Sequence, residues 1–303
     1  MNFLLKNGLN KSQLDVKNSL FPNHAYEIHL SNEIESCKDL QQKQNDTELA
    51  QKILKIFSDT PIKVIHTPLY KNHANFIEEK ETKEIFEYIV KTAEVVREKQ
   101  HLFNHIIVVV HNKLSIQDMQ KYGILDNTVK TLKTTAKKYP YIDIAIENTV
   151  WNYDTNEMDY YKNVELAAYC NELNIGVCID TCHILMSQYF DKIVRENYRN
   201  LQNNCTPTIK EWLTESNKQV PIKLIHFSNA KNTGNGFGKD LGHGCGFDKR
   251  KNEDKIILTE ILNTYQKINL TCPLTLELIE KDYMHPKNLP MTMECLTEIY
   301  KLN

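Results

Sequence analysis

The chain has 303 residues, of which 41% are hydrophobic and 25% charged, so it can bury a large core in one barrel-sized domain or in two smaller ones. A formal net charge of -2 excludes an overall basic protein, and any contact with nucleic acid must come from local groups of lysines. The eight cysteines are scattered and form neither a zinc-ribbon pair nor a dense disulfide framework, which favours reduced thiols.

Eight short runs rich in Ile, Val and Leu predict strands, and several are continuous enough for parallel strands covered on both faces. In chain order these runs are 2–7, 25–31, 62–66, 106–111, 142–147, 175–180, 222–227 and 273–279. Segments with helical periodicity alternate with them, at 46–58, 80–100, 124–138, 162–173, 186–200, 252–267 and 289–301. Alternation of strands and helices favours an α/β fold.

The absence of any break in composition predicts a single domain over residues 1–303, a (β/α)8 TIM barrel. In such a barrel the active site lies at the carboxyl ends of the strands, so residues remote in sequence converge there. The segment 228–250 contains six of the nine glycines, and we expect it to be a functional loop at that rim.

Five of the eight runs have a His, Asp or Glu at or next to their last residue, and the last run passes through Glu277. A charged or imidazole side chain is costly to bury beside Ile and Val unless it is paired or bound to a metal. Imidazole and carboxylate groups together suit Zn, Mn or Fe better than Ca or Mg. The sequence therefore predicts one shared metal site at the rim, from the strand-end residues and one histidine just beyond: His66, His111, Glu147, Asp180, His183, His226 and Glu277.

Four segments are more specific than this general layout: AIENT at 145–149, GVCIDTCHI at 176–184, IHFSNAK at 225–231 and PLTLELI at 273–279. In order and spacing they resemble the metal-site strands of the family-2 apurinic/apyrimidinic (AP) endonucleases, the endonuclease IV type. The resemblance covers residues 60–280 or so. The wider xylose-isomerase-like superfamily shares the Glu, Asp-x-x-His, His and Glu positions, and His66 and His111 favour the endonuclease.

The resemblance implies a zinc-dependent enzyme with two or three ions per chain, with Mn or Fe as alternatives. His66 and His111 would hold a first zinc, and Glu147 would bridge it to a second. The second would also be held by Asp180, His226 and Glu277. A hydroxide between the two ions would attack the phosphodiester, which makes Glu147, Asp180 and Glu277 the catalytic carboxylates.

In the family, His183 would belong to a third zinc that a downstream Asp-x-His pair completes. This chain lacks that pair, and the nearest candidates are Asp240 and His243, which two residues separate instead of one. If these two side chains fold back toward His183, the site holds three metals. If they do not, it is dinuclear.

The implied substrate is duplex DNA containing abasic sites, cut on the 5′ side by a monomeric enzyme. Such a nuclease must flip out the damaged nucleotide and grip the neighbouring phosphates. Lysines that follow the strand ends could serve there: Lys71, Lys113, Lys231, Lys239, Lys281 and Lys287.

Two other functions stay open. One is a sugar or sugar-phosphate isomerase or epimerase with a single divalent metal, in which His66 and His111 would contact substrate hydroxyls. The other is a barrel that binds DNA or a partner without turnover. Cys178 points into the predicted barrel beside Asp180, and we expect it to be a buried, unreactive thiol.

The amino-terminal segment lacks a signal-peptide cleavage site, and nowhere do about 18 apolar residues run together. We therefore expect an unsecreted, intracellular protein without membrane contacts. Its compartment would be the cytoplasm or, for a eukaryotic or viral source, the nucleus or the virus.

Overall fold

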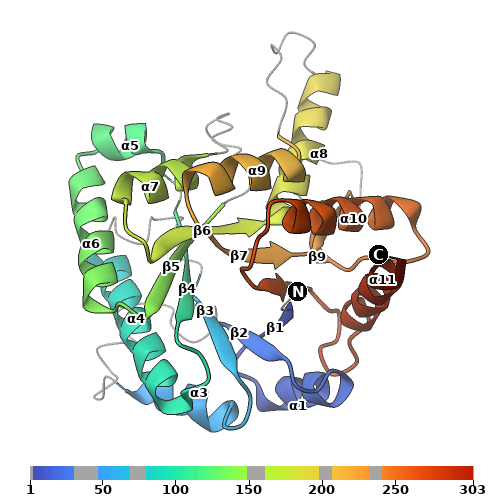
Figure 1. Cartoon of the computed structure of the whole chain (residues 1–303), viewed down its shortest axis with the longest axis horizontal. Coiled ribbons are helices and arrows are strands. Elements are labelled where there is room, and N and C mark those ends of the chain that lie inside the picture. Colours follow the sequence, from blue (N-terminus) through green and yellow to red (C-terminus); the bar gives the residue numbers. More distant parts are fainter. Residues whose placement is uncertain are drawn as a thin grey trace.

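Eight parallel strands close into a barrel at the centre of the molecule (Figure 1). The computed structural model describes residues 3–30, 47–68, 80–112, 114–148, 161–197, 207–232 and 241–302. The strands lie in chain order around the ring, and the last pairs with the first to close it. They are β1 (Phe3–Asn7), β2 (Ala25–His29), β3 (Ile62–His66), β4 (Ile106–His111), β5 (Ile142–Glu147), β6 (Ile175–Asp180), β7 (Ile222–Phe227) and β10 (Leu274–Leu276). The predicted (β/α)8 barrel is confirmed.

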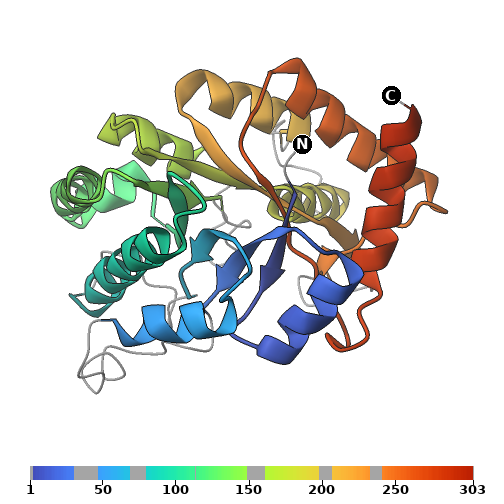
Figure 2. The same cartoon turned by 60° about the horizontal axis from the view of Figure 1, so that its bottom comes forward.

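Helices cover the outside of this barrel, as Figures 1 and 2 show. They are α1 (Lys11–Leu20), α3 (Glu48–Ile56), α4 (Lys80–Gln100), α5 (Ile116–Lys121), α6 (Leu125–Lys138), α7 (Lys162–Cys170), α8 (Thr181–Asn197), α9 (Ile209–Gln219), α10 (Asn252–Lys267) and α11 (Asn288–Leu302). Within the described ranges, none of them is both long and apolar enough to span a lipid bilayer.

All eight predicted strands and all seven predicted helices are present, and the sequence prediction missed α1, α5 and α9. Helix α5 has only six residues, which is too short for a periodic pattern. Helix α9 had a readable signal, because Thr208 and Glu211 form a capping box at its start. At α1, the Asn10 side chain accepts a hydrogen bond from the backbone of Gln13.

Helix α8 begins at Thr181, five residues before the predicted start at 186, because Asp180 caps it. The Asp180 Oδ1 atom accepts the backbone N–H groups of Cys182 at 2.6 Å and His183 at 3.2 Å. An N-cap side chain satisfies amides that have no partner within the helix. The strand therefore passes directly into the helix, and His183 lies in the first helical turn beside the end of β6.

The barrel interior is filled by a layer of small and branched side chains. Inward-facing positions alternate along each strand, and the outward-facing residues pack against the surrounding helices. The interior layer consists of Leu4, Val64, Ile107, Val109, Ala145, Cys178 and Leu224, with Ala25 packed against it. Cys178 thus faces into the barrel as predicted, and burial raises the pKa of its thiol far above the ordinary value.

A two-stranded antiparallel ribbon follows β7, formed by β8 (Asn229–Asn232) and β9 (Leu241–Cys245). It lies within the segment that the sequence predicts to be a rim loop. The ribbon packs against the first part of α8, where the Gly244 N–H donates to the Cys182 sulfur at 3.4 Å. The carbonyl oxygen of Gly244 accepts the Ile279 N–H at 2.8 Å, which ties the ribbon to the chain after β10.

Candidate metal centre

A layer of polar side chains lies next to the apolar interior layer, at the carboxyl ends of the strands. Each of its members comes two residues after an inward-facing residue, so strand alternation directs it into the same lumen. All eight strands contribute one such side chain: Lys6, Glu27, His66, His111, Glu147, Asp180 and His226 follow members of the apolar layer, and Glu277 follows the buried Thr275. Because the same alternation recurs in every strand, the barrel brings these eight side chains together at one end of its lumen.

Glu147 is the centre of this layer. Its Oε2 atom lies 3.0 Å from His66 Nε2 and 2.8 Å from His111 Nε2. Its Oε1 atom lies 2.9 Å from His226 Nδ1 on the other side. Each oxygen of one carboxylate therefore faces a different set of nitrogen donors, which is the arrangement of a carboxylate that bridges two cations.

The ligand set around His226 contains more carboxylates than the set around His66 and His111. Glu277 Oε2 lies 2.8 Å from His226 Nδ1. Possible ligand atoms of Glu147, Asp180, His226 and Glu277 all lie within 4.8 Å of one another, as do those of His66, His111 and Glu147. The structure thus brings together both ligand sets that the resemblance implies.

His183 and His243 meet at the rim beside Asp180. Their Nε2 atoms are 3.2 Å apart, close to the separation of about 3.3 Å between two nitrogens on one tetrahedral zinc. Asp180 Oδ2 lies 3.4 Å from His183 Nε2 and 3.6 Å from His243 Nε2. The ribbon of β8 and β9 therefore brings His243 to the place where the resemblance requires a third set of ligands. Asp240 lies outside the described residues.

The donor atoms themselves fit a cation. His66 Nδ1 donates to the Thr67 carbonyl at 2.7 Å, so a neutral His66 ring presents an unprotonated Nε2 to the Glu147 carboxylate. Burial, with the nearby Lys6 ammonium, lowers the pKa of His66 and disfavours a second proton. With Nε2 unprotonated, two acceptors face each other at 3.0 Å, and a cation bound to both would remove their repulsion.

The Asp180 carboxylate gives the same indication. Its Oδ2 atom is buried and accepts no hydrogen bond from the described part of the chain. A buried carboxylate oxygen without a donor is costly, and a metal ion removes that cost. His183 has the same orientation of its ring nitrogens as His66. Its Nδ1 donates to the Asn148 carbonyl at 2.7 Å, so a neutral ring can bind a metal through Nε2.

A family profile described as xylose isomerase-like TIM barrel matches residues 31–299. The chain belongs to that family. No curated protein matches it by sequence.

Solved structures share the xylose isomerase-like fold at low sequence identity. A xylose isomerase domain protein from Planctomyces limnophilus superposes with a TM-score of 0.60 at 14% identity, covering 99% of this chain and 96% of the other. The IOLI protein with a bound zinc atom has a TM-score of 0.57 at 14% identity, covering 98% and 97%. Endonuclease IV from Thermus thermophilus has a TM-score of 0.56 at 16% identity, covering 98% and 100%. Sugar epimerases are also among the similar structures.

Three residues of this candidate metal centre were not predicted. Lys6 and Glu27 lie inside the first two strands, to which the sequence prediction assigned no ligand. A charged residue within an apolar run is the sequence signal that could have identified Lys6 and Glu27. The third, Asn148, orients Asp180, because its Oδ1 accepts the Asp180 N–H at 2.6 Å and its Nδ2 donates to the Asp180 carbonyl at 3.2 Å.

The predicted phosphate-binding lysines are only partly described. Lys71, Lys113 and Lys239 lie outside the described residues. Lys231 lies on β8 and donates to the Gly246 carbonyl at 3.3 Å, while Lys281 and Lys287 are exposed after β10.

Mutual interactions set the charge of the central groups in the metal-free chain. Burial would raise the pKa of Glu147, but the facing His226 and His111 imidazoles hold it well below the ordinary value. Burial would lower the pKa of His226, but its neighbours raise it well above the ordinary value. The metal-free centre therefore retains a proton on His226 that a metal bound at the same nitrogen replaces.

These shifts predict a bell-shaped dependence of metal-free stability on pH. The raised pKa of His226 stabilises the folded chain below about pH 6.5, the unfolded value, and this contribution is lost as the pH rises through the folded value. The lowered pKa of Glu147 acts in the opposite sense, because its contribution is present above about pH 4.5 and is lost on acidification.

We therefore expect the free energy of unfolding, measured with urea in the presence of a chelator, to be greatest between about pH 4.5 and 6.5. Zinc should remove the loss on the alkaline side, because it takes the place of the proton on His226. The metal-free His226→Asn variant should not show this decrease in the free energy of unfolding above about pH 6.5. A metal-free stability that rises steadily to pH 8 would contradict this assignment.

Gly244 is required for the ribbon that carries His243. Its φ is +68°, and a Cβ there would lie 2.8 Å from Ile279 Cγ1 and 3.1 Å from the Ile279 backbone nitrogen. We expect Gly244→Ala to lower the free energy of unfolding by about 2 kcal/mol, from backbone strain and the clash together. Gly123→Ala is the matched control, because Gly123 has φ +69° with nothing within 4 Å. Equal losses in the two variants would show that the clash with Ile279 is unimportant.

Proposed function

We propose that this chain is a zinc-dependent DNA-repair phosphodiesterase that incises duplex DNA on the 5′ side of abasic sites. The observation that carries the proposal is the position of Glu147 between two ligand sets, with His66 and His111 on one oxygen and His226 on the other. An isomerase with one metal needs only the second set. The fold shared with endonuclease IV is consistent with the proposal.

The chain would supply an ordered frame for this reaction. Two or three zinc ions, when bound, would activate water, neutralise the phosphate and stabilise the leaving oxygen. Glu147 fixes the spacing of the two central ligand sets, since it belongs to both. His183 and His243 approach from α8 and β9, at the rim where a flipped-out nucleotide would enter. Manganese or iron could replace zinc in a mixed imidazole and carboxylate site.

The test is incision of a duplex oligonucleotide that carries one tetrahydrofuran abasic analogue, with metal content measured on the same preparation. We expect a single cut on the 5′ side of the lesion, a 3′-hydroxyl product, and two or three zinc ions per chain. The undamaged duplex of the same sequence is the control. Binding of the damaged duplex without incision in added zinc or manganese would instead support a non-catalytic protein.

A sugar isomerase or epimerase is the second candidate, and the four-residue set of Glu147, Asp180, His226 and Glu277 favours it. That set alone would hold one divalent ion that polarises a ketose, and sugar epimerases share the fold. In that case His66→Gln would leave the metal count at one per chain. A screen of ketoses for isomerisation, run beside the incision assay, distinguishes the two enzymes.

A further inference from the structure

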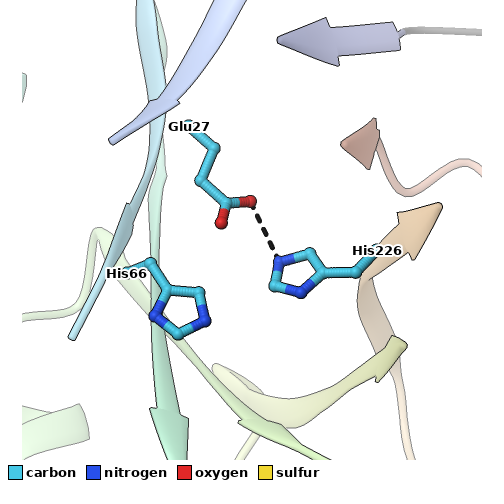
Figure 3. Close-up of side chains that lie close together, drawn as sticks. All are labelled: Glu27, His66 and His226. Atoms are coloured by element: carbon cyan, nitrogen blue, oxygen red, sulfur yellow. Dashed lines mark hydrogen bonds and ion pairs between the residues drawn. The ribbon is translucent and has the colours of Figure 1, made fainter. Parts of the chain in front are cut away.

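Glu27 is a buried acid that neither ligand set uses. It lies on β2 and is fully buried, and its carboxylate faces His226 across the lumen from β7, with His66 nearby (Figure 3). The Glu27 Oε2 atom lies 3.0 Å from His226 Nε2. The other ring nitrogen, Nδ1, lies 2.9 Å from Glu147 Oε1 and 2.8 Å from Glu277 Oε2. The two nitrogens of His226 therefore face different partners.

We infer that Glu27 is a positioning residue that fixes His226 as a ligand through Nδ1. A neutral imidazole carries one N–H, and a carboxylate can only accept it. Glu27 therefore holds that proton on Nε2 and leaves the Nδ1 lone pair directed at the set formed with Glu147 and Glu277. Carboxylates commonly orient metal-binding histidines in this way. The inference rests on the metal centre of the proposed function and is independent of the DNA substrate.

Both carboxylate oxygens of Glu27 face partners within the chain. The Lys6 ammonium lies 3.2 Å from Glu27 Oε1, and Glu27 Oε2 is already occupied by His226. Glu147 and Glu277, in contrast, both face the Nδ1 atom of His226, so Glu27 lies outside the set formed around that nitrogen.

Lys6 also holds the next ligand in place. Its ammonium donates to Glu277 Oε1 at 2.6 Å, which leaves Glu277 Oε2 directed at the His226 side. Lys6 and Glu27 together add no net charge to the centre. The pair therefore orients two ligands, His226 and Glu277, without altering the negative charge that the site offers to cations.

The decisive comparison is between two double variants of equal charge. Lys6→Met with Glu27→Leu removes the ion pair and the acceptor for His226, whereas Lys6→Met with Glu27→Gln removes the same charges but keeps a carbonyl acceptor. Replacing a buried ion pair by apolar residues of similar volume is often neutral for stability. Zinc affinity is measured by competition with a chelator on the full chain, and the folded state is checked by circular dichroism.

We expect the Leu double variant to bind the second zinc about 10- to 100-fold more weakly than the Gln double variant, with the first zinc unchanged. Asp143→Asn is the control for losing a paired carboxylate on a barrel strand, because Asp143 pairs with Lys223 at the opposite end of β5. It should bind zinc like the wild type. Equal affinities in the two double variants would overturn the role of Glu27.

A second measurement needs no variant. In zinc-loaded wild type labelled with 15N on histidine, we expect the His226 resonances to show a protonated Nε2 and a metal-bound Nδ1. Metal bound through Nε2 would overturn the inference. A wild-type chain that takes up no metal would overturn this inference and the proposed function together. Normal uptake with the opposite nitrogen bound would overturn the role of Glu27 alone.

Discussion

Glu147→Gln is expected to lower the single-turnover rate of incision on the order of 10³-fold, because one side chain serves both ligand sets. In the wild type, Oε2 faces His66 and His111 while Oε1 faces His226. A glutamine keeps one oxygen, and its NH2 group cannot bind a cation. Whichever way the amide turns, one ligand set loses its shared member.

The metal content of the same variant shows whether this reasoning is right. We expect the loss of at least one zinc per chain, measured after dialysis against a weak chelator. Gln has nearly the shape of Glu, so the apolar layer formed around Ala145 should remain packed. Glu147→Gln with wild-type metal content and wild-type incision would show that Glu147 does not bridge two cations. Lost incision with full metal content would place the defect in the chemical step.

The barrel and most of the polar layer were predictable because they depend on local patterns. A continuous apolar run predicts a parallel strand, and a titratable residue at its end predicts a rim position. His66, His111 and Glu147 all satisfy both conditions. Lys6 and Glu27 do not, because their strands continue for one or two residues beyond them. Strand alternation, applied to every charged residue within a run, would have predicted both.

The sequence analysis named His243 as a possible partner of His183 but left open whether the two side chains meet. Sixty positions separate them, and the segment that brings them together is rich in glycine and lacks periodicity. Its antiparallel ribbon depends on tertiary contacts, with Cys182 on one side and Ile279 on the other. The early start of α8 is different, because an Asp directly before a helix is a readable N-cap.

Asp180 combines two roles that a pair of variants can separate. Its Oδ1 atom caps α8 through the amides of Cys182 and His183, while Oδ2 accepts no hydrogen bond from the described residues and faces the ligand sets. Asp180→Asn retains an oxygen for the cap but places an NH2 group where the ligand oxygen lies. Asp180→Ala removes both functions.

We therefore expect both variants to lose incision by a factor on the order of 10²–10³ in zinc, since each lacks the ligand oxygen. Their stabilities should differ. In urea unfolding with a chelator present, Asp180→Ala should be less stable than Asp180→Asn by about 1 kcal/mol, the usual value of an N-cap. Equal stabilities would mean that the cap does not hold α8. In that case the position of His183 would depend on its 2.7 Å hydrogen bond to the Asn148 carbonyl and on its contact with His243.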